Sequence, residues 1–160
     1  MSRDDVDRTD FCNRLGRTIR RKGWRCRGFC LMPTHFHLLV ELDENTLQPG
    51  MQWLNGTYAQ QFNRRHSRWG HLNGARYFCG GVESDRHLLR AFRYIALNPV
   101  AAGLCERPQD WPWSSYRGSA GYDRGFPFVD DGVIRDLFGS DPAAATELLR
   151  AFVEEAVTEP

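Results

Sequence analysis

Two short apolar segments of strand character lie so close together that they constrain the fold of this chain more than any other feature. Trp24 to Leu31 and His35 to Leu42 are separated only by Met32-Pro33-Thr34. A connection this short joins neighbouring antiparallel strands, because a parallel crossover needs a dozen or more residues. The sequence therefore predicts a β-hairpin over residues 24–42.

Helical patterns flank this hairpin. Phe11, Leu15 and Ile19 recur at four-residue spacing, which predicts a helix from Asp7 to Lys22 that ends at Gly23. A second helix is expected from about Leu47 to His66 with Thr46 as its cap, and a third from a Ser84 cap to about Leu97, before a break or kink at Pro99. Between these two helices, Arg76 to Glu83 is predicted to form a short strand.

The order of these elements predicts an α+β fold, with a ferredoxin-like antiparallel sheet and packed helices. The length of 160 residues suits one core, which we assign to residues 1–117. Residues 118–160 are expected to form an acidic, mostly helical C-terminal extension, with its helix from Asp131 to Val157. The charged N-terminus, the lack of an apolar run of membrane-spanning length, and five scattered cysteines predict a cytoplasmic protein without disulfides.

The charge is unevenly distributed although its formal net value is only +1. Residues 11–40 carry seven basic residues and no acidic one, and residues 45–82 carry four and none. From residue 118 onward three basic residues face nine acidic ones, a net of 3 − 9 = −6. Nearly all the basic residues are arginines, whose planar fork suits phosphates and stacked bases, so nucleic acid is the simplest partner. A solvated helix face is the alternative explanation.

His35 and His37 are the first candidate site residues. Side chains at i and i+2 of a strand project from one face about 7 Å apart along the chain, so both imidazoles are expected on the same side, with Phe36 on the other. Such a pair can bind a divalent cation and leave positions open for a further ligand, although one histidine could be purely structural. A rival interpretation adds Cys26 and Cys30 to form a zinc cage, but two cysteines four apart on a strand lie too far apart to share an ion without a bend.

Tyr94 and Asn98 are four residues apart, so they share one face of the predicted third helix. A free phenol has a pKa of about 10, and a nearby cation would favour its nucleophilic form. The amide oxygen of Asn98 could be a third ligand of a hard ion such as Mg²⁺ or Mn²⁺. Simple packing is the alternative role for Tyr94. His87 lies on the same face, but about 10 Å further along the helix axis.

Several sequence words, in this order, resemble the REP-associated tyrosine transposases, a family of HUH single-tyrosine transposases. The stretch from Cys30 to Val40, CLMPTHFHLLV, is similar to the family's M-P-N-H-x-H-L-L, and Arg93 to Val100, RYIALNPV, is similar to R-Y-I-x-x-N-P-V. The segments Tyr58 to Arg64, Val82 to Asp85 and Trp113 to Arg117 fit as well, so that the likeness covers almost the whole chain.

This resemblance implies that His35 and His37 bind a metal ion, that Asn98 completes the metal shell, and that Tyr94 is the nucleophile. Enzymes of this kind cleave single-stranded DNA at hairpins, leaving a 5′-phosphotyrosine link and a free 3′-hydroxyl, and rejoin it without nucleotide hydrolysis. The expected partner is therefore single-stranded or hairpin DNA, bound by a monomer or a homodimer.

Five arginines are candidate contacts to the DNA backbone: Arg14, Arg17, Arg21, Arg64 and Arg65. Trp111 or Trp113 could stack on an unpaired base, but both could equally be core residues, and we favour the core for at least one of them. Two other functions remain open, a DNA-binding remnant of the same fold without catalysis and an RNA-binding module. The latter would need exposed aromatic side chains on its sheet.

The sequence departs from the family pattern at two places. Thr34 stands where the family has Asn, at the turn of the hairpin. The family also begins with a strand of the type Y-H-V-x-x-R-G, whereas this sequence starts at the first helix. A misassigned start, a partner that fills the gap, or an inactive copy would each explain this difference. In every case we expect a gap or an exposed edge in the sheet.

Overall fold

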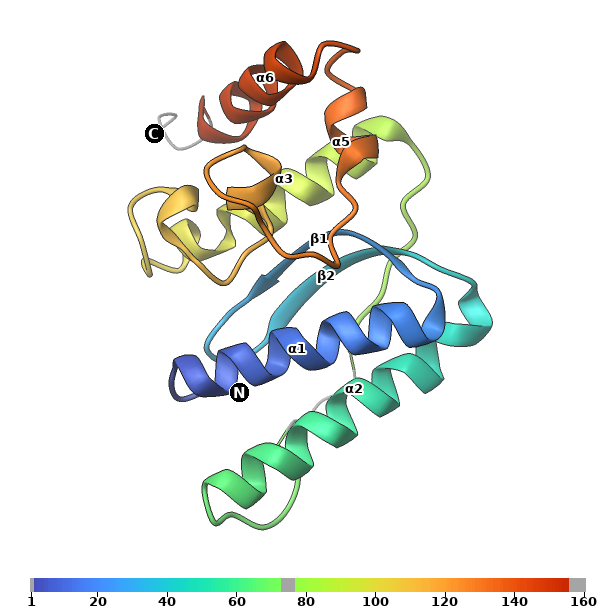
Figure 1. Cartoon of the computed structure of the whole chain (residues 1–160), viewed down its shortest axis with the longest axis vertical. Helices are drawn as coiled ribbons and strands as arrows, with labels where there is room; N and C mark the ends of the chain where they lie inside the picture. The colour runs from blue at the N-terminus through green and yellow to red at the C-terminus, as the bar shows by residue number, and fades with distance from the viewer. Residues whose placement is uncertain (1, 73–76, 156–160) are drawn as a thin grey trace.

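The computed structural model describes residues 2–72 and 77–155 of the chain. Helices predominate, and they surround a small sheet (Figure 1). In chain order the elements are α1 (Asp5–Lys22), β1 (Arg25–Leu31), β2 (Phe36–Glu41), α2 (Glu44–Arg65), α3 (Asp85–Ala101), the 3-10 helix η1 (Pro108–Asp110), α4 (Tyr116–Ser119), α5 (Gly132–Asp136) and α6 (Pro142–Glu154). The predicted α+β class with an antiparallel sheet is confirmed.

The predicted hairpin is the sheet. β1 and β2 pair antiparallel, and the backbone N–H of Met32 donates to the carbonyl of His35 at 2.9 Å across the turn. The outer edge of β1 is covered, because Leu31 donates to the carbonyl of Trp113 at 2.8 Å and Phe29 accepts from the backbone of Ser115 at 2.9 Å. Among the described residues no strand pairs with the other edge of β2.

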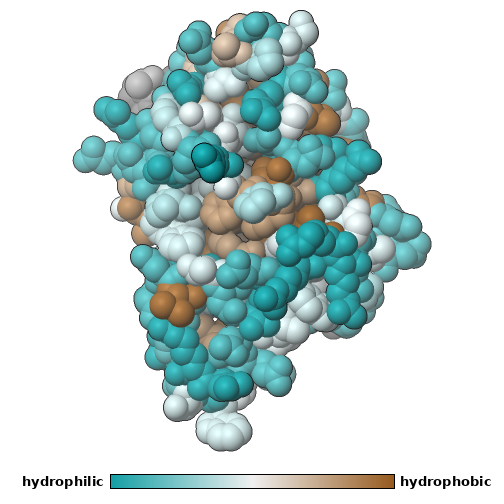
Figure 2. Space-filling view, viewed as in Figure 1, coloured by the Kyte–Doolittle hydropathy of each residue, from teal (hydrophilic) through white to brown (hydrophobic). Residues whose placement is uncertain are grey.

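Two helical layers cover the two faces of the hairpin (Figure 1). α1 and α2 pack on one face around Leu15 and Leu54, and Phe36 packs against this core as predicted. α3 and α6 form the other layer, around Phe92 and Leu149. Figure 2 shows a mostly hydrophilic face on which apolar side chains gather near the middle of the molecule. The sheet thus separates two small cores.

The helix ends follow local capping chemistry. The side chain of Asp4 accepts from the backbone N–H of Asp7, and Gly23 ends α1 with a φ of 68°. Ser84 caps α3 as predicted. The predicted Thr46 cap of α2 is wrong, because Asp43 caps the helix three residues earlier. The Thr46 hydroxyl instead accepts from the indole N–H of Trp24 at 2.8 Å.

Three other predicted elements need correction. Residues 77–83 form no strand, and Arg76 lies outside the described residues. This segment contains Gly80 and Gly81, which weaken a strand, and the Phe78 side chain is 97% exposed, so nothing buries it.

α3 continues through Pro99 to Ala101: the proline costs the one hydrogen bond that its missing N–H would make to Ile95, but the turn after it still closes, with Ala102 N–H donating to the Asn98 carbonyl at 3.0 Å. The acidic tail forms two helices rather than one, since Gly139, at a φ of 137°, and Pro142 separate α5 from α6. The predicted end at Val157 lies outside the described residues. No helix within residues 2–72 and 77–155 has the length and apolar character needed to cross a membrane.

Candidate active site

The hairpin brings His35 and His37 together, as their spacing predicts. His37 lies on β2, and His35 is the residue directly before this strand. Their Nε2 atoms are 3.0 Å apart, and the two rings meet edge to face at a centroid distance of 4.8 Å. The Thr34 hydroxyl lies 3.1 Å from Nδ1 of His35. When Thr34 accepts the proton of Nδ1, Nε2 of His35 carries a lone pair. In this structure that lone pair accepts a hydrogen bond from Nε2 of His37, which a bound cation would replace.

The spacing of the two nitrogens fits a divalent cation. Two ligands at right angles on an octahedral ion, each at a bond length of about 2.1 Å, lie about 3.0 Å from each other. Nε2 of His35 and Nε2 of His37 have this separation. No group of three or more His, Cys, Asp and Glu side chains in the described residues could hold a metal ion, so a third protein ligand would have to be of another type.

The environment of His37 favours its neutral form, which is the form that binds metals. Burial lowers the pKa of His37, and the proximity of His35 lowers it further. The nearby Asn98 side chain acts in the opposite direction but does not outweigh these two effects. A neutral imidazole at physiological pH keeps a lone pair available without a large cost of deprotonation.

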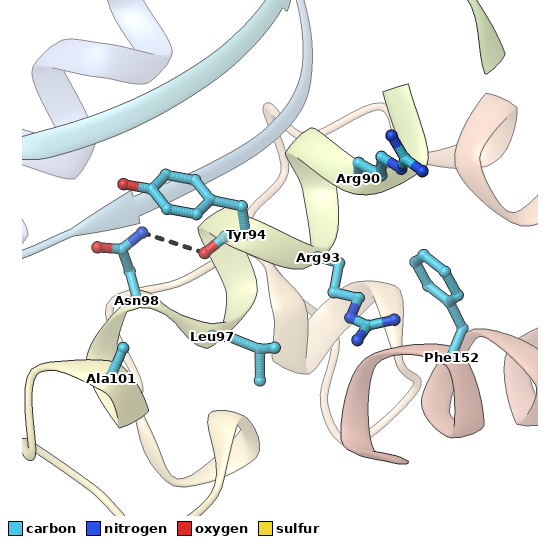
Figure 3. Close-up of a pocket in the computed structure, with 7 residues that line it drawn as sticks. All are labelled: Arg90, Arg93, Tyr94, Leu97, Asn98, Ala101 and Phe152. Atoms are coloured by element: carbon cyan, nitrogen blue, oxygen red, sulfur yellow. Dashed lines mark hydrogen bonds between the residues drawn. The ribbon is translucent and has the colours of Figure 1, made fainter. Parts of the chain in front are cut away.

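α3 brings Tyr94 and Asn98 to the same place. The Tyr94 ring stacks edge to face on His37 with a centroid distance of 5.4 Å, and Asn98 is close enough to His37 to affect its pKa. Nδ2 of Asn98 donates to the carbonyl of Tyr94 at 3.1 Å. In Figure 3 the Tyr94 hydroxyl and the Asn98 amide oxygen point to the same side of α3, toward the sheet. The Tyr94 side chain is 62% exposed, so a polymer can reach it.

Gly28 explains why α3 can lie so close to the hairpin. A bulge interrupts the register of β1 between Cys26 and Gly28. A Cβ atom at Gly28 would lie 3.2 Å from the Phe92 ring, which is a tight contact. Phe92 is a core residue of α3, half a turn before Tyr94. The absence of a side chain at Gly28 thus lets α3 approach the histidines.

The five candidate DNA-binding arginines all lie on α1 and α2, in the layer opposite α3. Arg17, Arg21 and Arg64 are exposed. Arg14 is paired with Asp10 at 2.7 Å, and Arg65 binds both Asp4 and Asp7 at the junction of α1 and α2. The structure therefore does not bring these arginines to Tyr94, and two of them already have acidic partners.

The rival residues have structural surroundings. Cys26 and Cys30 are fully buried and belong to different cores, so they form no zinc cage with the histidines. Trp111 and Trp113 are half-buried at the edges of the two cores, and the indole N–H of Trp111 donates to the carbonyl of Leu31 at 3.1 Å. His87 lies in the exposed first turn of α3.

Sequence reasoning missed three residues that surround Tyr94. Arg90, Arg93 and Phe152 line a pocket of about 540 Å³ together with Tyr94 and Asn98 (Figure 3). The helical spacing of Arg90 and Tyr94, four residues apart, could have indicated the first. Phe152 comes from α6, and no sequence signal links it to a residue so far away in the chain.

The comparisons with known proteins identify the family of this chain. The family model described as "Transposase IS200 like" matches residues 3–98, which include both histidines, Tyr94 and Asn98. The chain belongs to this family of transposases. It is 30% identical over 123 residues to a Haemophilus influenzae protein with the provisional name REP-associated tyrosine transposase. The aligned region covers 68% of this chain and 70% of that protein. No solved structure matches the chain.

Proposed function

We propose that this transposase cleaves and rejoins single-stranded hairpin DNA through a 5′-phosphotyrosine intermediate on Tyr94. His35, His37 and Asn98 would hold a divalent cation, Mg²⁺ or Mn²⁺. The observation that carries the proposal is the convergence of elements: two imidazole nitrogens 3.0 Å apart on the hairpin lie beside the exposed Tyr94 ring of α3. The family match supports a transposase acting on DNA, and this geometry supports the finer mechanism.

The reaction is an in-line displacement at phosphorus. Tyr94 loses its phenolic proton to solvent, and its oxygen forms a bond to the scissile phosphorus while the bond from phosphorus to the 3′-oxygen breaks. The leaving oxygen takes up a proton and becomes a free 3′-hydroxyl. One phosphate ester replaces another, so no nucleotide has to be hydrolysed, and the reverse reaction with a different 3′-hydroxyl joins a new strand.

Each residue of the site has a defined task in this reaction. A bound cation would withdraw charge from the scissile phosphate and stabilise the departing oxygen. Thr34 orients His35 through Nδ1, and Asn98 fixes its own amide by donating to the Tyr94 carbonyl. The exposed residues Arg17, Arg21 and Arg64 would bind DNA phosphates away from the cleavage site.

A covalent-adduct assay tests the proposal. Purified protein is incubated with Mn²⁺ and a labelled pool of oligonucleotides that carry a hairpin and random single-stranded flanks, and the products are separated on a denaturing gel. We expect a shifted protein–DNA adduct from the wild-type chain and none from Tyr94→Phe. Tyr77→Phe, which alters another exposed tyrosine, is the matched control and should keep the adduct.

Two outcomes would overturn the proposal. An undiminished adduct from Tyr94→Phe would mean that another residue is the nucleophile. No adduct from the wild-type chain, together with retained binding to the same pool, would favour the alternative of a DNA-binding protein without cleavage.

A further inference from the structure

We propose that the pocket beside Tyr94 binds the nucleotide on the 3′ side of the cleaved bond, with Arg90 on a phosphate and the Arg93–Phe152 pair under the base. This inference rests on the proposed function for the position of the nucleotide. The binding of a single strand by the pocket can be tested without any cleavage.

The pocket is close to the reacting group and has a suitable size. Its volume of about 540 Å³ lies within the ~300–1,000 Å³ range of small-molecule sites. Tyr94 and Asn98 form one side of it, and Phe152 lies across α3 from them in Figure 3. The Tyr94 hydroxyl points away from Phe152 in Figure 3, so a strand attached to Tyr94 has to turn back over α3 to enter this pocket.

Two cations in the pocket are available to an anion. Arg90 is exposed, and neither Arg90 nor Arg93 takes part in any ion pair found within the described residues. This differs from Arg14 and Arg65, whose guanidinium groups are paired with carboxylates. Arg90 is one helical turn before Tyr94, so its side chain can reach a phosphate next to the one attacked.

Arg93 and Phe152 form a stacked cation–π pair on the surface of the pocket. The guanidinium carbon of Arg93 lies 5.2 Å from the centroid of the Phe152 ring. Aromatic rings and guanidinium planes both stack on nucleic acid bases without sequence preference. Leu97 and Ala101 add apolar lining, which suits a base better than a second phosphate.

The C-terminal helix holds this surface in place. Phe152 also packs on Phe138 at a centroid distance of 5.6 Å, and the neighbouring Val153 is fully buried. At the end of α6, Glu154 accepts from the Tyr116 and Tyr122 hydroxyls, each at 2.7 Å. Because α6 is anchored at several points, Phe152 is positioned before any strand binds, which lowers the entropic cost of binding.

The bound nucleotide is assigned to the 3′ side of the cleaved bond because a 5′-phosphotyrosine keeps the downstream nucleotide attached to Tyr94.

Anisotropy measurements on the Tyr94→Phe chain, without divalent cations, isolate binding from cleavage. The probes are a fluorescein-labelled oligothymidylate and an otherwise identical strand without bases. Phe152→Leu and the charge-conserving Arg93→Lys remove stacking. For each variant we expect the ratio of affinities, base-bearing strand over strand without bases, to fall roughly tenfold. Arg90→Ala should reduce the slope of log K against log salt by roughly 0.7, the value of one phosphate contact.

Arg86→Ala is the matched control, because Arg86 lies one turn before Arg90 on α3, outside the residues that line the pocket. An equal change of slope for Arg86→Ala, or an unchanged base preference in both Phe152→Leu and Arg93→Lys, would overturn the inference.

Melting curves must show that Phe152→Leu remains folded. If the Phe152→Leu variant unfolds, Arg93→Lys still tests the stacking. Cleavage by the wild type with no effect of the pocket variants on binding would refute the pocket alone. Pocket-dependent binding without any adduct would refute the proposed cleavage alone.

Discussion

At the scale of single residues, the site depends on which atoms of His35 and His37 are free. Thr34 occupies Nδ1 of His35, and burial keeps the pKa of His37 below its usual value. The two Nε2 atoms then face each other at 3.0 Å, a separation that would be repulsive for two cations but suits a shared one. Thr34 stands where the REP-associated transposases, which the sequence resembles, have Asn. It still provides a hydrogen-bonding side chain at this position.

His37→Asn should weaken the binding of Mn²⁺ by more than the ~10- to 100-fold that loss of an outer-shell partner typically costs. The reason is that this substitution removes one of the two convergent nitrogens. Titration calorimetry of the unliganded protein measures the effect directly. His71→Asn removes an exposed imidazole outside the site and should leave the affinity unchanged. Equal affinities of wild type and His37→Asn would exclude the histidine pair as the metal site.

At the scale of elements, close packing of helices on the hairpin depends on glycines. Gly28 admits α3, and Gly50 admits α2 to the indole of Trp24. A Cβ atom at Gly50 would overlap the Trp24 ring, which is 4% exposed and bonded to Thr46, so it has little room to move. Gly56, on the same helix, has open space around it.

Gly50→Ala and Gly56→Ala should therefore have opposite effects on stability. Both exchanges favour a helix by ~0.5–1 kcal/mol, because alanine has less backbone entropy to lose. At Gly50 the overlap with Trp24 outweighs this gain, and we expect a net destabilisation of about 1–2 kcal/mol. Urea denaturation followed by circular dichroism measures both values. Stabilisation by Gly50→Ala would mean that α2 does not contact Trp24 as described.

At the scale of the whole molecule, ion pairs join elements that are distant in the sequence. Arg65, at the end of α2, binds Asp4 and Asp7 at the start of α1, and His66 lies 2.9 Å from Asp7. The Asp7 side chain is 2% exposed. Burial by itself would raise the pKa of Asp7, but hydrogen bonds from the Arg3 backbone, His66 and Arg65 lower it below its usual value.

Acid should weaken the folded state through this cluster. Hydrogen bonding to Arg65 lowers the pKa of Asp4 from 3.8 to about 2, and the pKa of Asp7 is lowered as well. A carboxyl whose pKa is depressed by folding stabilises the protein above its unfolded value, and this stability is lost as the pH falls through the folded value. We therefore expect the free energy of unfolding to fall as the pH decreases from about 4 toward 2.

Arg65→Met tests which group is responsible. It should destabilise the protein at neutral pH, because the buried Asp7 loses one of its partners, and it should reduce the further loss in acid. Arg64→Met, a change at an exposed neighbour, should leave the acid dependence as in the wild type. If Arg65→Met and the wild type lose equal stability between pH 4 and 2, the acid response originates elsewhere.

The sequence alone determined the hairpin, the three long helices α1, α2 and α3, and the residue pairs that lie within one element. The short connection at residues 32–34 fixed the hairpin, and the i, i+2 and i, i+4 spacings paired His35 with His37 and Tyr94 with Asn98. Such relations follow from the strand and helix periods, which depend only on neighbouring residues.

Only the tertiary structure decided which of these pairs meet and what else joins them. The edge-to-face contact of Tyr94 with His37 depends on α3 packing over Gly28, and the approach of Phe152 to Arg93 depends on the docking of α6. The strand expected near residues 76–83 did not form in residues 77–83, because Gly80 and Gly81 weaken a strand and no other described part of the molecule buries Phe78. Long-range contacts are selected by the burial of whole faces, and a single segment of sequence does not contain that information.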